Sequence, residues 1–138
     1  MHHYSEDKEL LVKEVQSAQS ENGTTDCKLL VIDDNEEIRN ILVDIFSPLY
    51  TVETASDGKE GYEKVKVMQP DLVISDIMMP GMDGIELCRR IKQTFEYCHI
   101  PVILLTAKNA DESRIEGYNS GADGYVTKPF NILELKAR

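Results

Sequence analysis

Short apolar runs that recur along the sequence, each closed by a polar residue, constrain the fold of this chain more than any other feature. Residues 29–32 and 72–74 carry only large aliphatic side chains, which is typical of strands buried on both faces of a sheet. Between such runs lie segments with apolar residues at helical spacing, such as Ile38, Leu42 and Ile45. This alternation of strand and helix patterns predicts an α/β domain with a parallel sheet.

The order of the strands follows from the connections between them. Right-handed crossovers predict five parallel strands in the order 2-1-3-4-5, in a doubly wound sheet with helices on both faces. Residues 50–55 alternate in polarity, which indicates an exposed edge strand. Asp57 is expected to cap the second helix, and Gln69 and Pro70 are expected to end it. The three later helices are expected to carry Leu87, Cys88, Ile91 and Phe95, then Ile115 and Tyr118, then Ile132, Leu133 and Leu135.

Composition narrows the class of protein. The chain has 138 residues and a net charge of −10, and such a surface repels phosphate backbones, so this domain is not expected to bind nucleic acid directly. Its apolar stretches are too short to cross a membrane, and its first residues do not form a signal peptide, so no membrane contact by this domain is expected. The cysteines lack metal-ligand spacing and fit a reducing cytoplasm, even if a longer parent chain is membrane-anchored.

Residues 1–27 differ from the remainder of the sequence. Residues 17–25 are polar and without periodicity, which is the composition of a linker. We therefore expect residues 1–27 to be a linker or the tail of a preceding region, and residues 28–138 to form one domain. The sequence ends at Arg138, so the last helix of that domain is expected to be truncated.

Chemically capable side chains follow the predicted strands at the edge where their carboxyl ends meet, and ligands bind in the crevice at that edge. They are Asp33, Asp34, Asp76, Thr106 and Lys128. Unit charges about 4 Å apart repel by roughly 4 kcal/mol at an effective dielectric of about 20, so clustered carboxylates need a cation. Mg²⁺, with Mn²⁺ as a substitute, suits a site of carboxylates and waters. Because an aspartate can attack phosphorus, the pattern predicts a divalent-metal site beside a phosphoryl acceptor.

Four segments together resemble the receiver domain of two-component response regulators, in one register over residues 28–138. They read VIDDN at 31–35, SDIMMPGMDG at 75–84, LTA at 105–107 and GADGYVTKPF at 121–130. The resemblance implies a flavodoxin-like fold, which agrees with the strand order predicted above. It also implies that Asp76 is the phosphoacceptor. The metal ligands that it implies are Asp33, Asp34, Asp76 and the backbone carbonyl of Met78.

The resemblance assigns a switch to the far side of the same edge. Thr106 corresponds to the hydroxyl that turns toward the phosphoryl group, and Tyr125 to the aromatic side chain that moves with it. Lys128 corresponds to the lysine that binds the phosphoryl group, and Lys128–Pro129 to a cis peptide bond. Neither Met78 nor Lys108 is suited to position a hydrolytic water, so we expect slow self-dephosphorylation.

The resemblance further implies partners. The phosphoryl donor would be a histidine kinase or a histidine phosphotransfer domain, and the output would pass to an effector domain of the parent protein, with a phosphorylation-dependent dimer as a further expectation. Residues 99–108 and 113–117 are similar to receivers of hybrid sensor histidine kinases, some of which carry an AraC-type DNA-binding domain. Transcription regulation by such a hybrid parent is the favoured interpretation, and a separate response regulator with a C-terminal effector is the alternative. The domain itself is not expected to be an enzyme beyond its own Mg²⁺-dependent phosphorylation and dephosphorylation.

Three other classes fit the residues less well. A haloacid-dehalogenase-type phosphatase needs a second aspartate two residues after its nucleophile, and Met78 stands there. A flavodoxin needs a hydroxyl- and glycine-rich phosphate loop after the first strand, where Asp34, Glu36 and Glu37 would repel phosphate. A degenerate receiver that serves only as a binding module usually lacks an acid or the acceptor, and neither is missing from this sequence.

Overall fold

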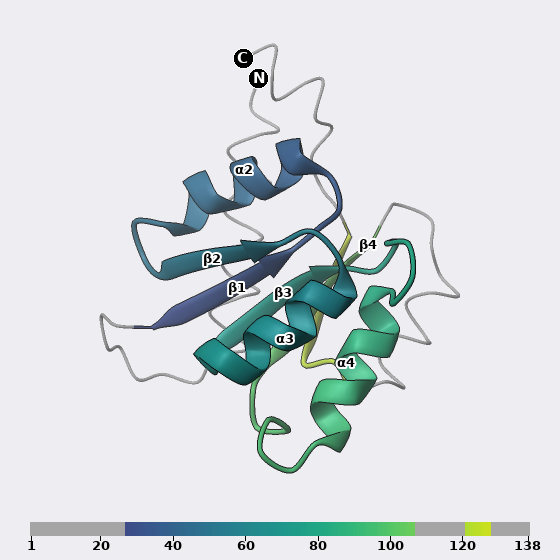
Figure 1. Cartoon of the computed structure of the whole chain (residues 1–138). Coiled ribbons are helices and arrows are strands. Elements are labelled where there is room, and N and C mark those ends of the chain that lie inside the picture. The colour runs from purple at the N-terminus through teal and green to yellow at the C-terminus, as the bar shows by residue number, and fades with distance from the viewer. Residues whose placement is uncertain (1–26, 107–120, 128–138) are drawn as a thin grey trace.

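The computed structural model describes residues 27–106 and 121–127, and within them five parallel strands form one sheet (Figure 1). The strand order is β2-β1-β3-β4-β5, which confirms the prediction. The strands are β1 (Lys28–Ile32), β2 (Thr51–Ala55), β3 (Leu72–Asp76), β4 (Val102–Thr106) and β5 (Gly124–Thr127). Strands β3 and β4 are buried along their whole length, whereas the first four residues of β2 alternate between exposed and half-buried, as expected for an edge strand.

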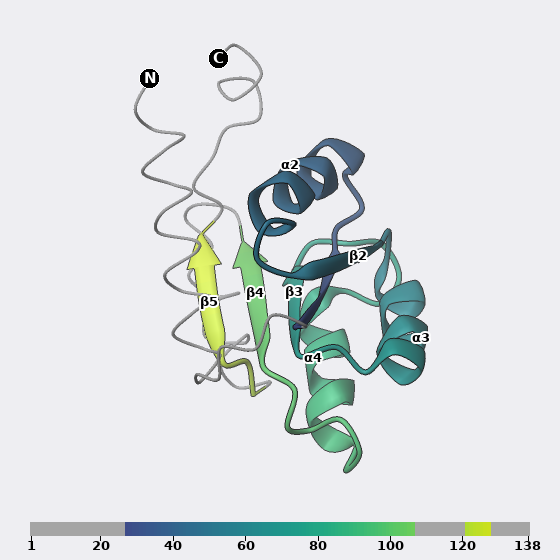
Figure 2. The same ribbon diagram turned by 90° about the vertical axis from the view of Figure 1, so that its left-hand side faces the viewer.

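Three helices in the described part of the chain cover the two faces of the sheet. They are α2 (Glu36–Phe46), α3 (Gly58–Met68) and α4 (Gly84–Gln93). Helix α2 packs on one face, where Leu42 and Phe46 meet Leu29 and Val31 of β1. Helices α3 and α4 lie together on the opposite face (Figures 1 and 2). The domain therefore has three layers, and all its strands point their carboxyl ends toward the same edge.

Short polar side chains begin each of these helices. The Asn35 Oδ1 atom accepts hydrogen bonds from the backbone N–H groups of Glu37 and Ile38, at 2.8 and 3.1 Å. Asp57 caps α3 as predicted, and Asp83 caps α4 in the same way. Gln69 ends α3 in the left-handed conformation, with φ of 47°, which confirms that the helix stops before Pro70. One of these caps, Asn35, directly follows the predicted site residue Asp34, so capping also fixes the turn that carries it.

The prediction that the third helix carries Phe95 is wrong. Helix α4 ends at Gln93, and the Phe95 side chain is 88% exposed. Thr94 explains the early end, because its Oγ1 donates a hydrogen bond to the Arg90 carbonyl at 2.8 Å and its backbone is extended. A hydroxyl that satisfies a late carbonyl competes with continuation of the helix. Leu87, Cys88 and Ile91 are buried as predicted.

Several predicted features lie outside the described residues. They are the two last helices, the Lys128 side chain, the Lys128–Pro129 peptide and Lys108. None of the described helices combines the length and the apolar character that a membrane span requires.

Candidate functional site

The carboxyl edge of the sheet brings together the three aspartates that the sequence singled out. Asp33 follows β1 directly, and Asp76 is the last residue of β3, which pairs with β1. Carboxylate oxygens of Asp33, Asp34 and Asp76 all lie within 4.8 Å of one another. The predicted convergence of these three carboxylates at the strand ends is therefore confirmed.

The three carboxylates differ in exposure. Asp33 is fully buried and Asp76 is 3% exposed, whereas Asp34 is exposed. The cluster thus has a buried base and one side that opens to solvent, through which a ligand can enter. Ionised groups this close repel strongly in a poorly solvated setting. A small divalent cation would relieve that repulsion, and three carboxylate oxygens are the hard donors that Mg²⁺ prefers, so the residues fit such an ion.

Hydrogen bonds to its backbone hold the turn after β1 in place. The Asp33 N–H donates to the Ala55 carbonyl of β2 at 3.1 Å, and Asp33 Oδ1 accepts from the Asn35 N–H at 2.9 Å. The Asp33 carbonyl accepts from Arg39 Nη1 at 2.7 Å. The sequence interpretation did not identify Arg39; the only available signal was an arginine one helical turn beyond the acidic pair.

The loop after β3 is held by a close backbone approach. The Gly84 N–H donates to the Ile77 carbonyl at 3.0 Å. A Cβ atom on Gly84 would lie 2.1 Å from the Asp76 carbonyl oxygen, so only glycine fits there. Met78 projects its side chain into solvent with 68% exposure, whereas Met79 is buried. A role of the Met78 carbonyl in metal binding remains a prediction.

Thr106 and Tyr125 lie in β4 and β5, the two strands that follow β3 in the sheet. Thr106 ends β4 and is 3% exposed, and Tyr125 in β5 is 7% exposed. Tyr125 pairs in register with Leu104, and in a parallel pair such neighbours point to the same face. Thr106 lies two residues beyond Leu104, so Thr106 and Tyr125 share one face of the sheet. The coupled movement of the two side chains remains a prediction.

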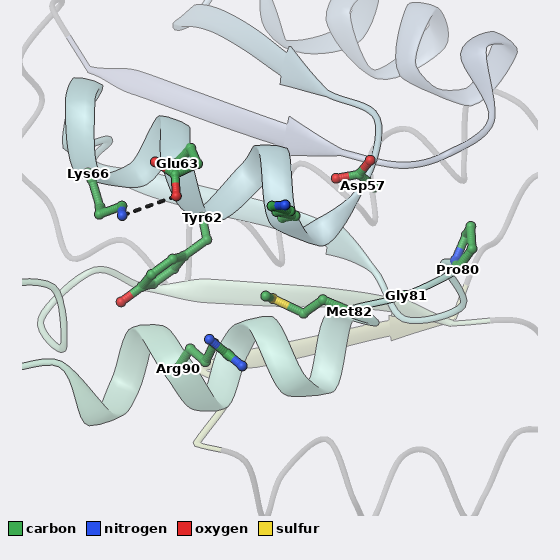
Figure 3. A pocket seen from close by; sticks show the side chains of 9 residues that line it. Asp57, Tyr62, Glu63, Lys66, Pro80, Gly81, Met82 and Arg90 are labelled. Carbon is green, nitrogen blue, oxygen red and sulfur yellow. Dashed lines mark ion pairs between the residues drawn. The ribbon is translucent and has the colours of Figure 1, made fainter.

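A separate hollow of about 540 Å³ lies between α3 and α4 (Figure 3). Met82 lies between the two helices, the Tyr62 ring reaches from α3 toward α4, and Arg90 projects from α4. Lys66 at its border pairs with Glu63 at 3.1 Å. None of the three clustered aspartates lines this hollow. The candidate site is therefore the open carboxyl edge and not this groove.

One further carboxylate lies at the carboxyl end of β2. The Glu60 Oε1 atom accepts hydrogen bonds from the N–H and the hydroxyl of Ser56, both at 2.9 Å. These bonds are the main cause that lowers the pKa of Glu60 below its ordinary value, and the charges of Lys64 and Arg39 lower it further. Glu60 is thus an acidic residue near the site that is already stabilised as an anion.

The fold and the acidic edge define a class of signalling domain, and comparison with known proteins identifies it. Residues 29–138 match the response regulator receiver domain, and the chain belongs to this family. It is a receiver domain of two-component signalling.

Particular relatives fall in two kinds of protein. The chain is 41% identical over 110 residues to hybrid signal transduction histidine kinase D of Dictyostelium discoideum, covering 80% of this chain and 7% of that protein. It is also 41% identical over 112 residues to the alkaline phosphatase synthesis transcriptional regulatory protein PhoP of Bacillus subtilis, covering 80% of this chain and 46% of that protein. The chain therefore spans less than half the length of either relative.

A solved structure shows the same fold. The chemotaxis protein CheY4 of Vibrio cholerae is 35% identical and superposes with a TM-score of 0.71, over 83% of this chain and 98% of that one. The five-stranded order predicted from the sequence is thus the order of a known receiver structure.

Proposed function

We propose that this receiver domain accepts a phosphoryl group on Asp76 from a phosphohistidine of a histidine kinase or a histidine phosphotransfer domain. The observation that carries the proposal is the gathering of Asp33, Asp34 and Asp76 within 4.8 Å at the carboxyl edge of the sheet. Asp33, Asp34, Asp76 and the backbone carbonyl of Met78 would hold Mg²⁺ there. The bound ion supplies positive charge that offsets repulsion between these carboxylates and the incoming phosphoryl group.

The transfer is a nucleophilic displacement by Asp76. One of its carboxylate oxygens attacks the phosphorus, the P–N bond of the phosphohistidine breaks, and the electron pair remains on the imidazole nitrogen. Asp76 is suited to this role because it ends the fully buried strand β3, which holds its backbone in place. The exposed side of the cluster at Asp34 gives the donor imidazole access.

Phosphorylation would act through the groups beside Asp76. The new group adds up to about −2 charge and three acceptor oxygens. Thr106 and Lys128 would bind those oxygens, and Tyr125 would move as Thr106 turns. Thr106 and Tyr125 share a sheet face, which supports a coupled movement. The modification thereby biases an equilibrium between two conformations that exists beforehand.

The output lies in a longer parent protein. A hybrid sensor histidine kinase that regulates transcription is the proposed parent, since one relative is a hybrid histidine kinase; PhoP, a transcriptional regulatory protein, illustrates the alternative of a separate regulator with its own effector. Residues 1–27 would be the linker before a domain over 28–138. A reducing cytoplasm is the proposed location of this domain. A phosphorylation-dependent dimer remains part of the proposal.

Incubation with acetyl phosphate and Mg²⁺, followed by intact mass measurement, tests the proposal. The wild-type chain should gain one phosphoryl group, and chelation of Mg²⁺ should prevent it. Asp76→Asn should gain none, whereas Asp71→Asn, at the opposite end of the same strand, should react as the wild type does. A phosphoryl adduct on Asp76→Asn, or no adduct on the wild type, would contradict the proposal. The lifetime of the adduct then tests the expected slow self-dephosphorylation.

A further inference from the structure

The Arg39 guanidinium contacts the main chain of the acidic turn. Its Nη1 atom donates to the Asp33 carbonyl at 2.7 Å. Arg39 is half-buried on α2, and Asp33 is fully buried. A short bond from a charged donor is stronger than a bond between neutral groups, and it is stronger still away from water.

This bond acts on one particular peptide unit. The Asp33 carbonyl and the Asp34 N–H belong to the same rigid plane. The orientation of that plane decides the direction in which the Asp34 side chain leaves the turn. Asp33 itself is held from two other sides, because its N–H donates to Ala55 at 3.1 Å and its Oδ1 accepts from Asn35 at 2.9 Å. Arg39 therefore fixes the one plane that links the buried aspartate to the exposed one.

The charge of Arg39 also acts on Glu60 in the first turn of α3. The pKa of Glu60 is lowered mainly by its hydrogen bonds from Ser56, and the charges of Lys64 and Arg39 add to the effect. Arg39 is thus near enough to the Glu60 carboxylate to influence its ionisation.

We propose that Arg39 is a positioning residue for the cation site, which orients the Asp33–Asp34 peptide without touching the ion or the phosphoryl group. The inference rests on the proposed Mg²⁺ site. The competing explanation is purely structural: the bond ties α2 to the end of β1 and stabilises the fold, with no effect on cation binding. The two explanations differ in what happens to the affinity for Mg²⁺ in a protein that is still folded.

Calorimetric titration of the 138-residue chain with Mg²⁺ separates them. Arg39→Met, which keeps the length of the side chain but loses the charge and the donors, should weaken Mg²⁺ binding about tenfold, as changes in groups that orient metal ligands do. Arg39→Lys, which keeps a charged donor, should recover most of the affinity. Arg90→Met is the matched control, because Arg90 donates to Glu86 at 3.0 Å on α4, and its affinity should equal that of the wild type.

Two further measurements keep the test independent of activity. Urea unfolding establishes that each variant is folded under the titration conditions. Amide hydrogen exchange without Mg²⁺ reports on the turn itself, where the Asn35 N–H that donates to Asp33 should exchange faster in Arg39→Met than in Arg90→Met.

Each outcome has one meaning. Weaker Mg²⁺ binding in Arg39→Met, rescued by lysine and absent in Arg90→Met, supports the positioning role. Lower stability of Arg39→Met with unchanged Mg²⁺ affinity overturns that role and leaves the proposed function intact. A wild-type chain that binds no Mg²⁺ overturns both proposals.

Discussion

Aspartates lie at both ends of the same parallel sheet, and the two ends use them differently. At the amino end, Asp71 precedes β3 and accepts the Lys28 N–H of β1 at 2.8 Å, while its own N–H donates to the Lys28 carbonyl. Asp123 precedes β5 and repeats the arrangement with Val102 of β4, at 2.9 Å. At the carboxyl end, three carboxylates crowd within 4.8 Å of one another.

The comparison shows that an acidic residue beside a strand is not by itself a functional signal. The amino-end aspartates each complete the hydrogen bonding of a neighbouring strand, and Asp123 also binds Lys92 Nζ at 2.6 Å. These contacts stabilise the fold. The carboxyl-end aspartates concentrate like charge instead, and the repulsion between these charges opposes folding. Substitutions should therefore have opposite effects on stability at the two ends.

The largest effect on stability is expected from the close backbone packing of the loop after β3, at the carboxyl end of the sheet where the three aspartates crowd together. Gly84→Ala places a Cβ atom 2.1 Å from the Asp76 carbonyl oxygen and 2.9 Å from Ile77 Cα. Because both neighbours are backbone, the loop must shift, and we expect a loss of about 3 kcal/mol in the free energy of unfolding. Urea denaturation measures this change.

Gly81→Ala is the control for that substitution. Gly81 has φ of 75° but no atom within 4 Å of an added Cβ, so only conformational strain is introduced, with an expected cost of about 1–2 kcal/mol. Equal losses at the two glycines would show that the close approach to Asp76 does not hold the loop.

The next effect tests the amino end. Asp123→Ala leaves the Val102 N–H and the Lys92 ammonium without this acceptor in a partly buried place, so we expect a loss of about 2 kcal/mol. Asp71→Ala removes the equivalent bond at an exposed position and should cost less than about 1 kcal/mol, because water can replace it. Neither substitution should change Mg²⁺ affinity. A changed affinity in either variant would contradict the view that the amino-end aspartates stabilise the fold without a part in cation binding.

The sequence predicted the arrangement of the aspartates at the carboxyl end of the sheet but not of those at the amino end. Asp33, Asp34 and Asp76 were predicted to converge because strand direction alone places them at one edge. The strand order followed in the same way from apolar runs and right-handed crossovers. The roles of Asp71 and Asp123 were not predicted, since Asp71 meets the backbone of Lys28, 43 residues away.

The misses share a physical cause. Phe95 was placed in a helix because its spacing fits, but the Thr94 hydroxyl bonds the Arg90 carbonyl and the helix ends. Arg39 was overlooked because its partner is a carbonyl, which leaves no trace in the pattern of side chains. Contacts from a side chain to a distant backbone atom depend on the folded structure, so sequence patterns predict them poorly. Lys128 lies outside the described residues, and its role stays a prediction.

A smaller effect of opposite sign is expected at the crowded end. Asp34→Asn removes one charge from the cluster at an exposed position, where unit charges about 4 Å apart repel by about 1 kcal/mol in water. Without Mg²⁺ this variant should therefore be more stable than the wild type by up to about 1 kcal/mol. Mg²⁺ should raise the melting temperature of the wild type, because a ligand that binds only the folded state stabilises it, and should raise that of Asp34→Asn much less. Thermal unfolding with Mg²⁺ and with chelator measures both effects, and a destabilised Asp34→Asn without Mg²⁺ would contradict the crowding argument.

The smallest effect on stability is expected at Glu60. It tests whether the position of a carboxylate at the carboxyl edge, or its own hydrogen bonds, determines its contribution to stability. Glu60 lies near the carboxyl edge but is bonded by Ser56, and its pKa is lowered chiefly by those bonds. A carboxylate with a lowered pKa adds stability above its unfolded pKa, and that stability is lost as the pH falls through its folded pKa. Glu60→Gln should therefore cost a few tenths of a kcal/mol at neutral pH, given the exposure of the group, and the difference from wild type should vanish on acidification.

Ser56→Ala, which removes the hydroxyl donor but keeps the N–H, should give a smaller difference with the same pH dependence. Urea unfolding from neutral to acid pH measures both, and a difference that grows on acidification would mean that Glu60 belongs with the crowded aspartates. The expected result instead places Glu60 with Asp71 and Asp123, so that the crowding of like charge, rather than the end of the sheet, distinguishes the site.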